Sequence, residues 1–506
     1  SNKSASLVLA WALGRIGALG PREPPRWGRG ALESRLSWGR GSRGQPRWGG
    51  AQGWRACVAN LEPVASTKER PALPKGPYLV VGLARSGQAA ARLLAARGER
   101  VVAIDAGHPE GAERLRELGV EVHLDGDHES LVDSARCVVK SPGVPREAAP
   151  VRRALALGLP VIGELELAWR LIPNAFVAVT GTNGKTTTTE LLGHIWRAAG
   201  RPVVVAGNVG TPLASLVGEL DPDATVVCEC SSFQLEDSVA FAPEVAVLLN
   251  VTPDHIDRHG DLAAYRDAKL RIFANQTRRD WAIYDSSQPG LRGLRVGGQA
   301  RVVDLGTMGA GGLAEFLADT ALAGPHNLAN ARAAEAAALA MGIDRETIRA
   351  ALASFPGVPH RLERVAERDG VLYVNDSKAT NVAAATAALR SFDRPVRVIL
   401  GGSLKGEDFA GLAEPVAERC ASAYLIGPAA EPIERALAPA AGRGVAVRRC
   451  ADLADAVRAA AGDAQPGDVV LLSPACASFD AFRNYEERGE RFRELVAALG
   501  RQGGGA

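Results

Sequence analysis

The chain has 506 residues, of which 46% are hydrophobic and 23% are charged, and this balance is typical of a soluble globular protein. One hydrophobic core rarely grows so large, so the length predicts about three domains. No stretch of about 18 uncharged apolar residues occurs, which excludes a membrane-spanning helix. The early apolar run at 6–13 is too short, and has the wrong flanks, for a secretory signal.

Cysteines and charges are unevenly distributed. Seven cysteines without a CxxC pair favour free thiols in the cytoplasm over a disulfide framework. Residues 1–75 hold 13 Lys and Arg against 4 Asp and Glu, a net charge of +9, which leaves −7 for the rest of a chain whose total is +2.

The same 75 residues also differ in composition. They contain five of the eight tryptophans, set among Gly, Arg and Pro, without sustained helical or strand periodicity. We therefore expect a disordered N-terminal extension. A disordered tail or translated upstream sequence is favoured over a basic, aromatic arm that binds nucleic acid or membrane.

Regular structure is expected after this extension. A buried strand at 78–81, a glycine-rich turn at 82–87 and a helix are followed by a strand at 101–104 that ends at Asp105. This order is a β-turn-α-β unit. The turn is GxGxxG with Ala84 at the second glycine, which allows NAD, FAD or another nucleotide, and also a purely structural turn.

A second block contains the sharpest motif of the chain. A buried strand at 175–179 runs into Gly181-Thr-Asn-Gly-Lys-Thr-Thr187 and a helix. Glycines let backbone N–H groups close on phosphate oxygens, and a helix N-terminus adds a positive end. Lys185 would reach the β- and γ-phosphates and Thr186 would face Mg²⁺. The strict pattern requires glycine where Val179 stands, so a tight turn with a solvated lysine is the alternative.

Further strands at 203–205, 225–228 and 245–249 alternate with helices, and continuous apolar strands predict a parallel sheet covered on both faces. The carboxyl ends of such strands face the phosphate loop. Glu229 follows one strand and His255 lies after another, so both are candidate magnesium ligands. A surface glutamate and an ordinary loop histidine are the alternatives.

A third block, from about residue 359, repeats the alternation of strands and helices and predicts a second doubly wound sheet. Polar segments at 375–381 and 473–479 follow two of its strands. Each could bind an anion at a helix start or could simply cap that helix.

Together these motifs resemble the Mur ligases, over nearly all of residues 76–501. The segments that carry the resemblance, besides the phosphate loop, are Gly207–Gly210, Glu229–Glu236, Asn250–Arg258, Asn375–Asn381, Leu472–Asp480 and Asn484–Tyr485. The phosphate loop is shared with all Mur ligases and with folylpolyglutamate synthases. The Ser-Ser-Phe-Gln-Leu and Ser-Pro-Ala-Cys-Ala-Ser stretches resemble the D-glutamate-adding branch more selectively.

The resemblance implies an α/β fold of three domains. A Rossmann-like N-terminal domain at 76–164 would bind the UDP-substrate, and a central P-loop ATPase-like parallel sheet at 165–357 would bind ATP. A Rossmann-like C-terminal domain at 358–501 would bind the amino acid, before a flexible tail at 502–506. We expect a cytoplasmic monomer with small-molecule substrates, no nucleic-acid partner and no membrane span.

The implied reaction is an ADP-forming ligation in peptidoglycan precursor synthesis. ATP would drive the joining of D-glutamate to UDP-N-acetylmuramoyl-L-alanine through an acyl phosphate. The resemblance assigns catalysis to Lys185, Glu229, His255 and Lys269. Two Mg²⁺ sites would involve Thr186, Glu229, His255 and Lys269, with Lys269 as a candidate N6-carboxylysine or, alternatively, a plain surface lysine.

The resemblance also implies three sets of binding residues. For the UDP-substrate they are Arg85, Ser86, Gly87, Asp105 and Asn208. For ATP they are Gly181, Thr182, Asn183, Gly184, Lys185, Thr186, Thr187, Arg361 and Asp376. For D-glutamate they are Lys378, Thr380, Lys405, Ser478 and Tyr485. Phe479 and Tyr485 depart mildly from a family pattern that includes Leu and Phe.

Three alternatives stay open at this point. The first is a neighbouring ligase that adds another amino acid. The second is a nucleotide-binding regulator without ligase activity, against which the retained Lys185, Glu229, His255 and Lys269 argue. The third is an NAD-dependent enzyme built on residues 82–87, which leaves the phosphate loop unexplained.

Overall fold

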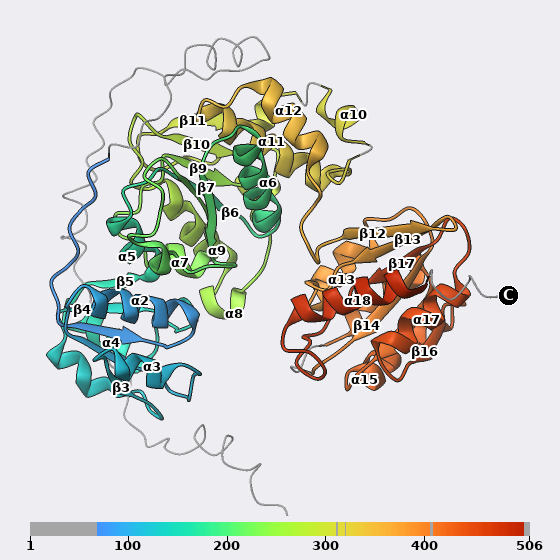
Figure 1. Ribbon diagram of the computed structural model, residues 1–506, viewed down its shortest axis with the longest axis horizontal. Coiled ribbons are helices and arrows are strands. Elements are labelled where there is room, and N and C mark those ends of the chain that lie inside the picture. The colour runs from blue at the N-terminus through green and yellow to red at the C-terminus, as the bar shows by residue number, and fades with distance from the viewer. Residues whose placement is uncertain (1–67, 310–311, 319, 405–407, 500–506) are drawn as a thin grey trace, which may run out of the picture. The chain divides into compact units, whose positions relative to one another are not determined.

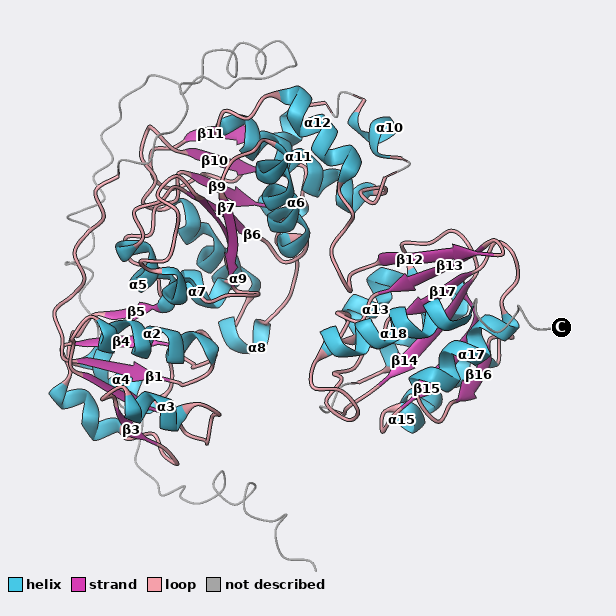
Figure 2. Cartoon of the chain, in the orientation of Figure 1, coloured by secondary structure: helices cyan, strands magenta, loops and turns pink. Residues whose placement is uncertain are grey.

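A computed structural model describes residues 68–499 except 310, 311, 319 and 405–407 (Figure 1). The expected disorder of residues 1–67 and the expected tail at 502–506 therefore lie outside the described residues. Three sheets are present, and helices alternate with their strands (Figure 2). No helix in the described part of the chain is long and apolar enough to cross a membrane.

The first sheet has five parallel strands in the order β3-β2-β1-β4-β5. The strands are β1 (Tyr78–Val81), β2 (Val101–Ile104), β3 (Glu121–His123), β4 (Cys137–Lys140) and β5 (Val161–Gly163). Its helices are α2 (Arg85–Ala96), α3 (Ala112–Glu117), the 3₁₀ helix η2 (Glu129–Ser134) and α4 (Ala149–Ala156). The strand order reverses between β1 and β4, and ligands bind at such switch points.

The second sheet has six parallel strands in the order β11-β10-β9-β6-β8-β7. They are β6 (Phe176–Thr180), β7 (Val203–Gly207), β8 (Thr225–Glu229), β9 (Val245–Leu248), β10 (Trp281–Tyr284) and β11 (Arg301–Asp304). Helices α6 (Lys185–Ala198), α11 (Pro325–Ala340) and α12 (Arg345–Ser354) pack on one face. Helices α5 (Glu164–Leu171), α7 (Ser232–Glu236) and α9 (Leu262–Leu270) pack on the other. Cover on both faces explains why these strands are continuously apolar.

Short elements complete this part of the chain. They are η3 (Leu213–Leu216), α8 (Ile256–His259), η4 (Arg271–Phe273), η5 (Pro289–Leu291), η6 (Leu305–Thr307) and α10 (Leu313–Leu317).

The third sheet has the order β12-β13-β17-β14-β15-β16, and β12 alone is antiparallel to its neighbour. The strands are β12 (Glu363–Arg368), β13 (Val371–Asn375), β14 (Val396–Gly401), β15 (Cys420–Ile426), β16 (Ala446–Arg449) and β17 (Val469–Leu472). The helices are α13 (Val382–Leu389), η7 (Ala410–Leu412), α14 (Ala413–Arg419), α15 (Ala430–Ala436), α16 (Ala438–Ala441), α17 (Leu453–Asp463) and α18 (Tyr485–Leu499).

The α/β class expected from the sequence is confirmed. The alanine-rich stretch at 326–354 forms two helices, α11 and α12, because Gly342 adopts a φ of +72° after α11. Residues 68–75 were expected to belong to the N-terminal extension; they lie within the described residues, where Lys68 and Arg70 contact the second sheet's domain.

Candidate active site

The phosphate-loop sequence forms the connection between β6 and α6. Gly184, the residue before α6, has a φ of +86°, and a Cβ there would lie 2.2 Å from Asn330 Oδ1. Both facts require glycine. Asn250 Oδ1 accepts the Asn183 N–H at 2.9 Å, and Asn250 Nδ2 donates to the Asn183 carbonyl at 3.1 Å. The segment after β9 therefore fixes the shape of the loop.

Two lysines share an acceptor in this loop. Lys185 Nζ donates to the Gly181 and Thr182 carbonyls, each at 2.9 Å, and Lys269 Nζ from α9 donates to the same Gly181 carbonyl at 2.8 Å. Burial lowers the pKa of Lys185, and Glu229 opposes this shift. Burial, helped by the Lys185 charge, lowers the pKa of Lys269 to about 7. One half-buried and one buried amine, neither of them in an ion pair within the described residues, suit a polyphosphate anion.

Thr186 and Glu229 meet beside this loop. The Thr186 hydroxyl donates to Glu229 Oε2 at 2.8 Å, and Asn208 Nδ2 donates to Glu229 Oε1 at 2.9 Å. Glu229 is buried at the carboxyl end of β8. The described residues contain no group of three or more His, Cys, Asp or Glu that could hold a metal ion. Hydroxyl and carboxylate oxygens still fit Mg²⁺, which takes few protein ligands when phosphate supplies others.

His255 lies at the start of α8 with a φ of +52°, and its side chain is 49% exposed. Its ring centroid is 5.0 Å from that of Phe233 and 6.3 Å from that of Tyr265. Its Nε2 lies 3.5 Å from Asp254 Oδ2. The structure thus places His255 on an exposed loop edge, with one carboxylate beside it.

The expected UDP-substrate residues surround the turn after β1. Asp105 Oδ2 accepts the Leu83 N–H at 2.6 Å and Oδ1 accepts the Gly107 N–H at 2.8 Å, so this carboxylate caps the turn. A Cβ on Gly87 would lie 1.8 Å from the Gly82 carbonyl oxygen. Ser86 follows in the first turn of α2.

Arg85 connects that turn to the second sheet. Its guanidinium donates to the carbonyl of Gly210, in the segment that also contains Asn208. The structure therefore brings Arg85 close to the loop that carries Asn208, and Asn208 itself bonds Glu229.

In the third sheet, Asp376 joins the two polar segments. Its Oδ1 accepts the Leu362 N–H at 3.1 Å and its Oδ2 accepts the Ser473 hydroxyl at 2.8 Å. Burial raises its pKa to about 7. Arg361 precedes Leu362, so the expected ATP residues Arg361 and Asp376 lie close together in this domain.

The expected D-glutamate residues lie around the same segments. Lys378 Nζ is 5.7 Å from the Tyr485 ring centroid and 3.4 Å from Thr186 Oγ1. Thr380 is half-buried and Ser478 is buried. Lys405 lies outside the described residues.

Sequence reasoning missed Arg488, which organises these segments. It is buried in α18 and donates to the Ser377 hydroxyl and carbonyl and to the Cys476 and Ala477 carbonyls, at 2.9–3.1 Å. Burial lowers its pKa to about 10. In the sequence, Arg488 stands among the other glutamates and arginines of α18, so nothing distinguishes it from a solvent-exposed charge. Asn330 was also missed, although a polar residue within an alanine-rich helix is a detectable signal.

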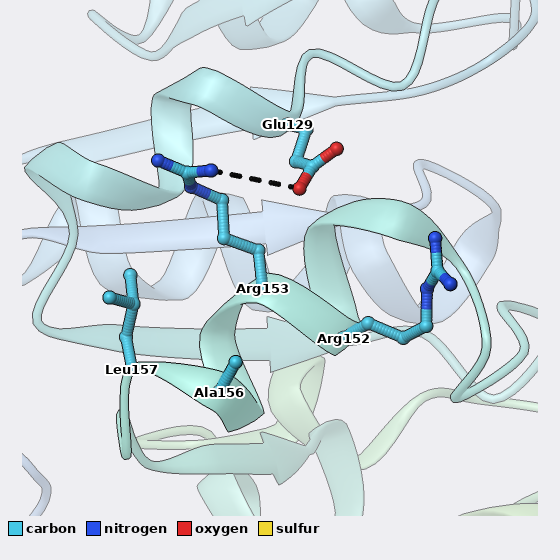
Figure 3. A pocket seen from close by; sticks show the side chains of 5 residues that line it. All are labelled: Glu129, Arg152, Arg153, Ala156 and Leu157. Carbon is cyan, nitrogen blue, oxygen red and sulfur yellow. Dashed lines mark ion pairs between the residues drawn. The ribbon is translucent and has the colours of Figure 1, made fainter. Parts of the chain in front are cut away.

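A hollow of about 370 Å³ lies away from these groups, on η2 and α4 of the first domain (Figure 3). Its lining residues are Glu129, Arg152, Arg153, Ala156 and Leu157. Arg153 is already paired with Glu129 at 3.7 Å and with Asp133. This hollow is therefore no competitor for the candidate site.

Three family models match the chain. They are the Mur ligase MurD-like N-terminal domain over residues 77–163, the Mur ligase middle domain over 179–311, and the Mur ligase glutamate ligase domain over 360–476.

Curated relatives extend this similarity over most of the chain. A UDP-N-acetylmuramoylalanine--D-glutamate ligase from Pelotomaculum thermopropionicum is 45% identical over 445 residues, covering 83% of this chain and 97% of the relative. Proteins of the same name from Salinibacter ruber and Koribacter versatilis are 44% and 41% identical, and cover 83% and 84% of this chain and 97% and 98% of their own lengths.

A solved UDP-N-acetylmuramate-alanine ligase from Thermotoga maritima is 17% identical, with a TM-score of 0.49 and coverage of 84% of this chain and 100% of that one. The three domain matches and the relatives above 40% identity show that the chain belongs to the Mur ligase family, whose members are ATP-dependent ligases.

Proposed function

We propose that this protein joins D-glutamate to UDP-N-acetylmuramoyl-L-alanine, with ATP converted to ADP and phosphate, as a cytoplasmic monomer in peptidoglycan precursor synthesis. The observation that carries the proposal is the phosphate loop with Lys185, Lys269, Thr186 and Glu229 around it. The names of the relatives supply the substrates.

The chemistry follows from the difficulty of displacing oxide from a carboxylate. The L-alanyl carboxylate would attack the γ-phosphorus of ATP, which forms an acyl phosphate and releases ADP. The D-glutamate amine would then attack the acyl carbon, lose a proton and expel phosphate. Lys185 would neutralise charge on the transferring group, where positioning and electrostatics supply most of the catalysis.

We propose that Thr186 and Glu229 hold a first Mg²⁺, and that His255 and Lys269 serve a second. When bound, Mg²⁺ neutralises phosphate charge. Lys269 is suited to carbamylation, because a pKa of about 7 leaves much of its amine neutral and able to add CO₂ with loss of a proton. A carbon-13 resonance from labelled CO₂, lost in Lys269→Met, would test this modification.

Phosphate release with UDP-N-acetylmuramoyl-L-alanine and ATP tests the whole proposal. D-Glutamate should support turnover, and L-alanine, meso-diaminopimelate and L-lysine should not. Turnover with only one of the other amino acids would contradict the choice of D-glutamate. ATP binding without product from any amino acid would favour a regulator instead.

A further inference from the structure

The turn after β4, Ser141–Val144, packs directly against the turn expected to hold the UDP-substrate. The Ser141 hydroxyl donates to the Gly82 carbonyl at 2.6 Å. A Cβ on Gly82 would lie 2.5 Å from Val144 Cγ2, and one on Gly87 would lie 2.5 Å from Ser141 Oγ. The two turns sit at the β1–β4 switch point of the first sheet. A displacement of Ser141–Val144 would therefore change the shape of the turn at residues 82–87.

Arg258 of α8 reaches this turn from the second sheet's domain. Its guanidinium donates to the Gly143 carbonyl at 3.1 Å and to the Val144 carbonyl at 3.2 Å. The group also lies 4.8 Å from the centroid of the Phe233 ring, which orients it. Arg258 follows His255 by one helical turn, so one short element carries both residues.

A second cation, the buried Lys140, contacts the same Ser141–Val144 turn. Lys140 Nζ donates to the Val144 carbonyl at 2.9 Å and forms an ion pair of 2.7 Å with Asp237, the residue after α7. Helix α7 begins just after Glu229. Two of the segments that carry candidate metal ligands, those that follow Glu229 and His255, are thus each connected through one cation to the Ser141–Val144 turn.

We propose that Arg258 is a positioning residue that holds the Ser141–Val144 turn in register with the segment carrying His255. It sets the shape of the UDP-substrate turn without touching the reacting atoms. This inference rests on the proposed function only for the identity of the substrate. The lysine ammonium carries its donors on one nitrogen at the end of a flexible chain and lacks the planar fork that also lies against Phe233, so lysine replaces Arg258 incompletely.

The test compares Arg258→Met and Arg258→Lys with a matched control, Arg266→Met. Arg266 is an exposed arginine of α9 that lies 3.8 Å from Asp267. We expect Arg258→Met to raise the KM for UDP-N-acetylmuramoyl-L-alanine about tenfold, with the KM for ATP and D-glutamate within about twofold of wild type. The KM of Arg258→Lys for this substrate should lie between those of wild type and Arg258→Met, and the KM of Arg266→Met should equal that of wild type.

Calorimetric binding of UDP alone separates this inference from the proposed function, because it requires no turnover. The Kd for UDP should rise in Arg258→Met by about the same factor as the KM. An unchanged UDP affinity, or an equal rise in all three KM values, would overturn the positioning role. If Arg258→Met does not fold, the same comparison with Arg258→Lys decides, and wild-type affinity there would also overturn it.

Discussion

Lys185 is held in place by the backbone of the phosphate loop. Its ammonium is held by two loop carbonyls 2.9 Å away, where it can transfer its hydrogen bonds to phosphate oxygens. We expect Lys185→Ala to lower kcat by on the order of 10²–10³-fold, because a preorganised charge on the transferring group is lost. Phosphate release measures kcat and circular dichroism checks the fold. A near-normal kcat in the folded variant would remove Lys185 from the mechanism.

Glu164 offers a pH test outside the active site. It is buried at the start of α5, its Oε1 accepts the Ala214 N–H at 2.6 Å, and burial raises its pKa from 4.5 to about 7. A raised carboxyl pKa means that the folded protein binds the proton more tightly, so stability falls as pH rises from about 4.5 through about 7. Glutamine keeps the acceptor and does not ionise.

We therefore expect Glu164→Gln to be more stable than wild type by up to about 3 kcal/mol at pH values near 8, and nearly equal to it at pH values near 4.5. Urea midpoints across this pH range measure the difference. Glu166, two residues along, accepts the N–H groups of Val239, Ala240 and Phe241 and pairs with Arg170, so it has the compensation that Glu164 lacks. A stability difference that is independent of pH would contradict the assignment.

At the scale of single elements, helix α6 begins after Gly184, whose backbone conformation is unfavourable for residues with a side chain. At Gly184 a side chain meets two penalties, a φ of +86° and the 2.2 Å approach to Asn330 Oδ1. Gly184→Ala should therefore lower the free energy of unfolding by roughly 1–3 kcal/mol, which a lower melting temperature would show. The same change should also weaken ATP binding. The control is Gly200→Ala, because Gly200 has a φ of +65° but no atom within 4 Å of its Cβ position. Equal effects in both variants would mean that strain alone matters.

Most elements could be predicted from the sequence where a strand is buried on both faces. The strands β1 and β9 are continuously apolar and fully buried, and they were found at nearly their observed bounds. The strands β3 and β16 were missed because they lie at sheet edges and are partly exposed, so Glu121 and Arg448 interrupt the apolar pattern. The strand β10 was also missed, although it is buried inside its sheet. Hydrophobic periodicity reports burial, and edge strands have little of it.

At the scale of the whole molecule, the sequence indicates which segments contain candidate functional residues. It indicates less well which of their side chains contact one another. Asp376 and Ser473 lie 97 positions apart and bond only because β13 and β17 are neighbours in the sheet. The sharing of the Gly181 carbonyl by Lys185 and Lys269 likewise depends on how α9 packs. Strand order decides such pairs, and no local pattern encodes it.

The N-terminal boundary gives the last prediction. Lys68 Nζ lies 2.6 Å from Asp280 Oδ1 and 2.8 Å from the Ala242 carbonyl, and the Arg70 guanidinium lies 4.3 Å from the Trp169 ring centroid and 3.6 Å from Glu244. Asp280 and Glu244 are both buried, so removal of their cations leaves two charges uncompensated.

We expect deletion of residues 1–67 to leave activity and melting temperature unchanged, because the composition of this segment predicts a disordered extension. Deletion of residues 1–75 should cost on the order of 3 kcal/mol, since breaking a buried pair from one side exposes the full desolvation penalty. Asp280→Asn in the shorter protein should recover part of that loss by removing one unpaired charge. Thermal melts of the three proteins measure both effects, and equal melting temperatures for the two deletions would show that Lys68 and Arg70 contribute nothing.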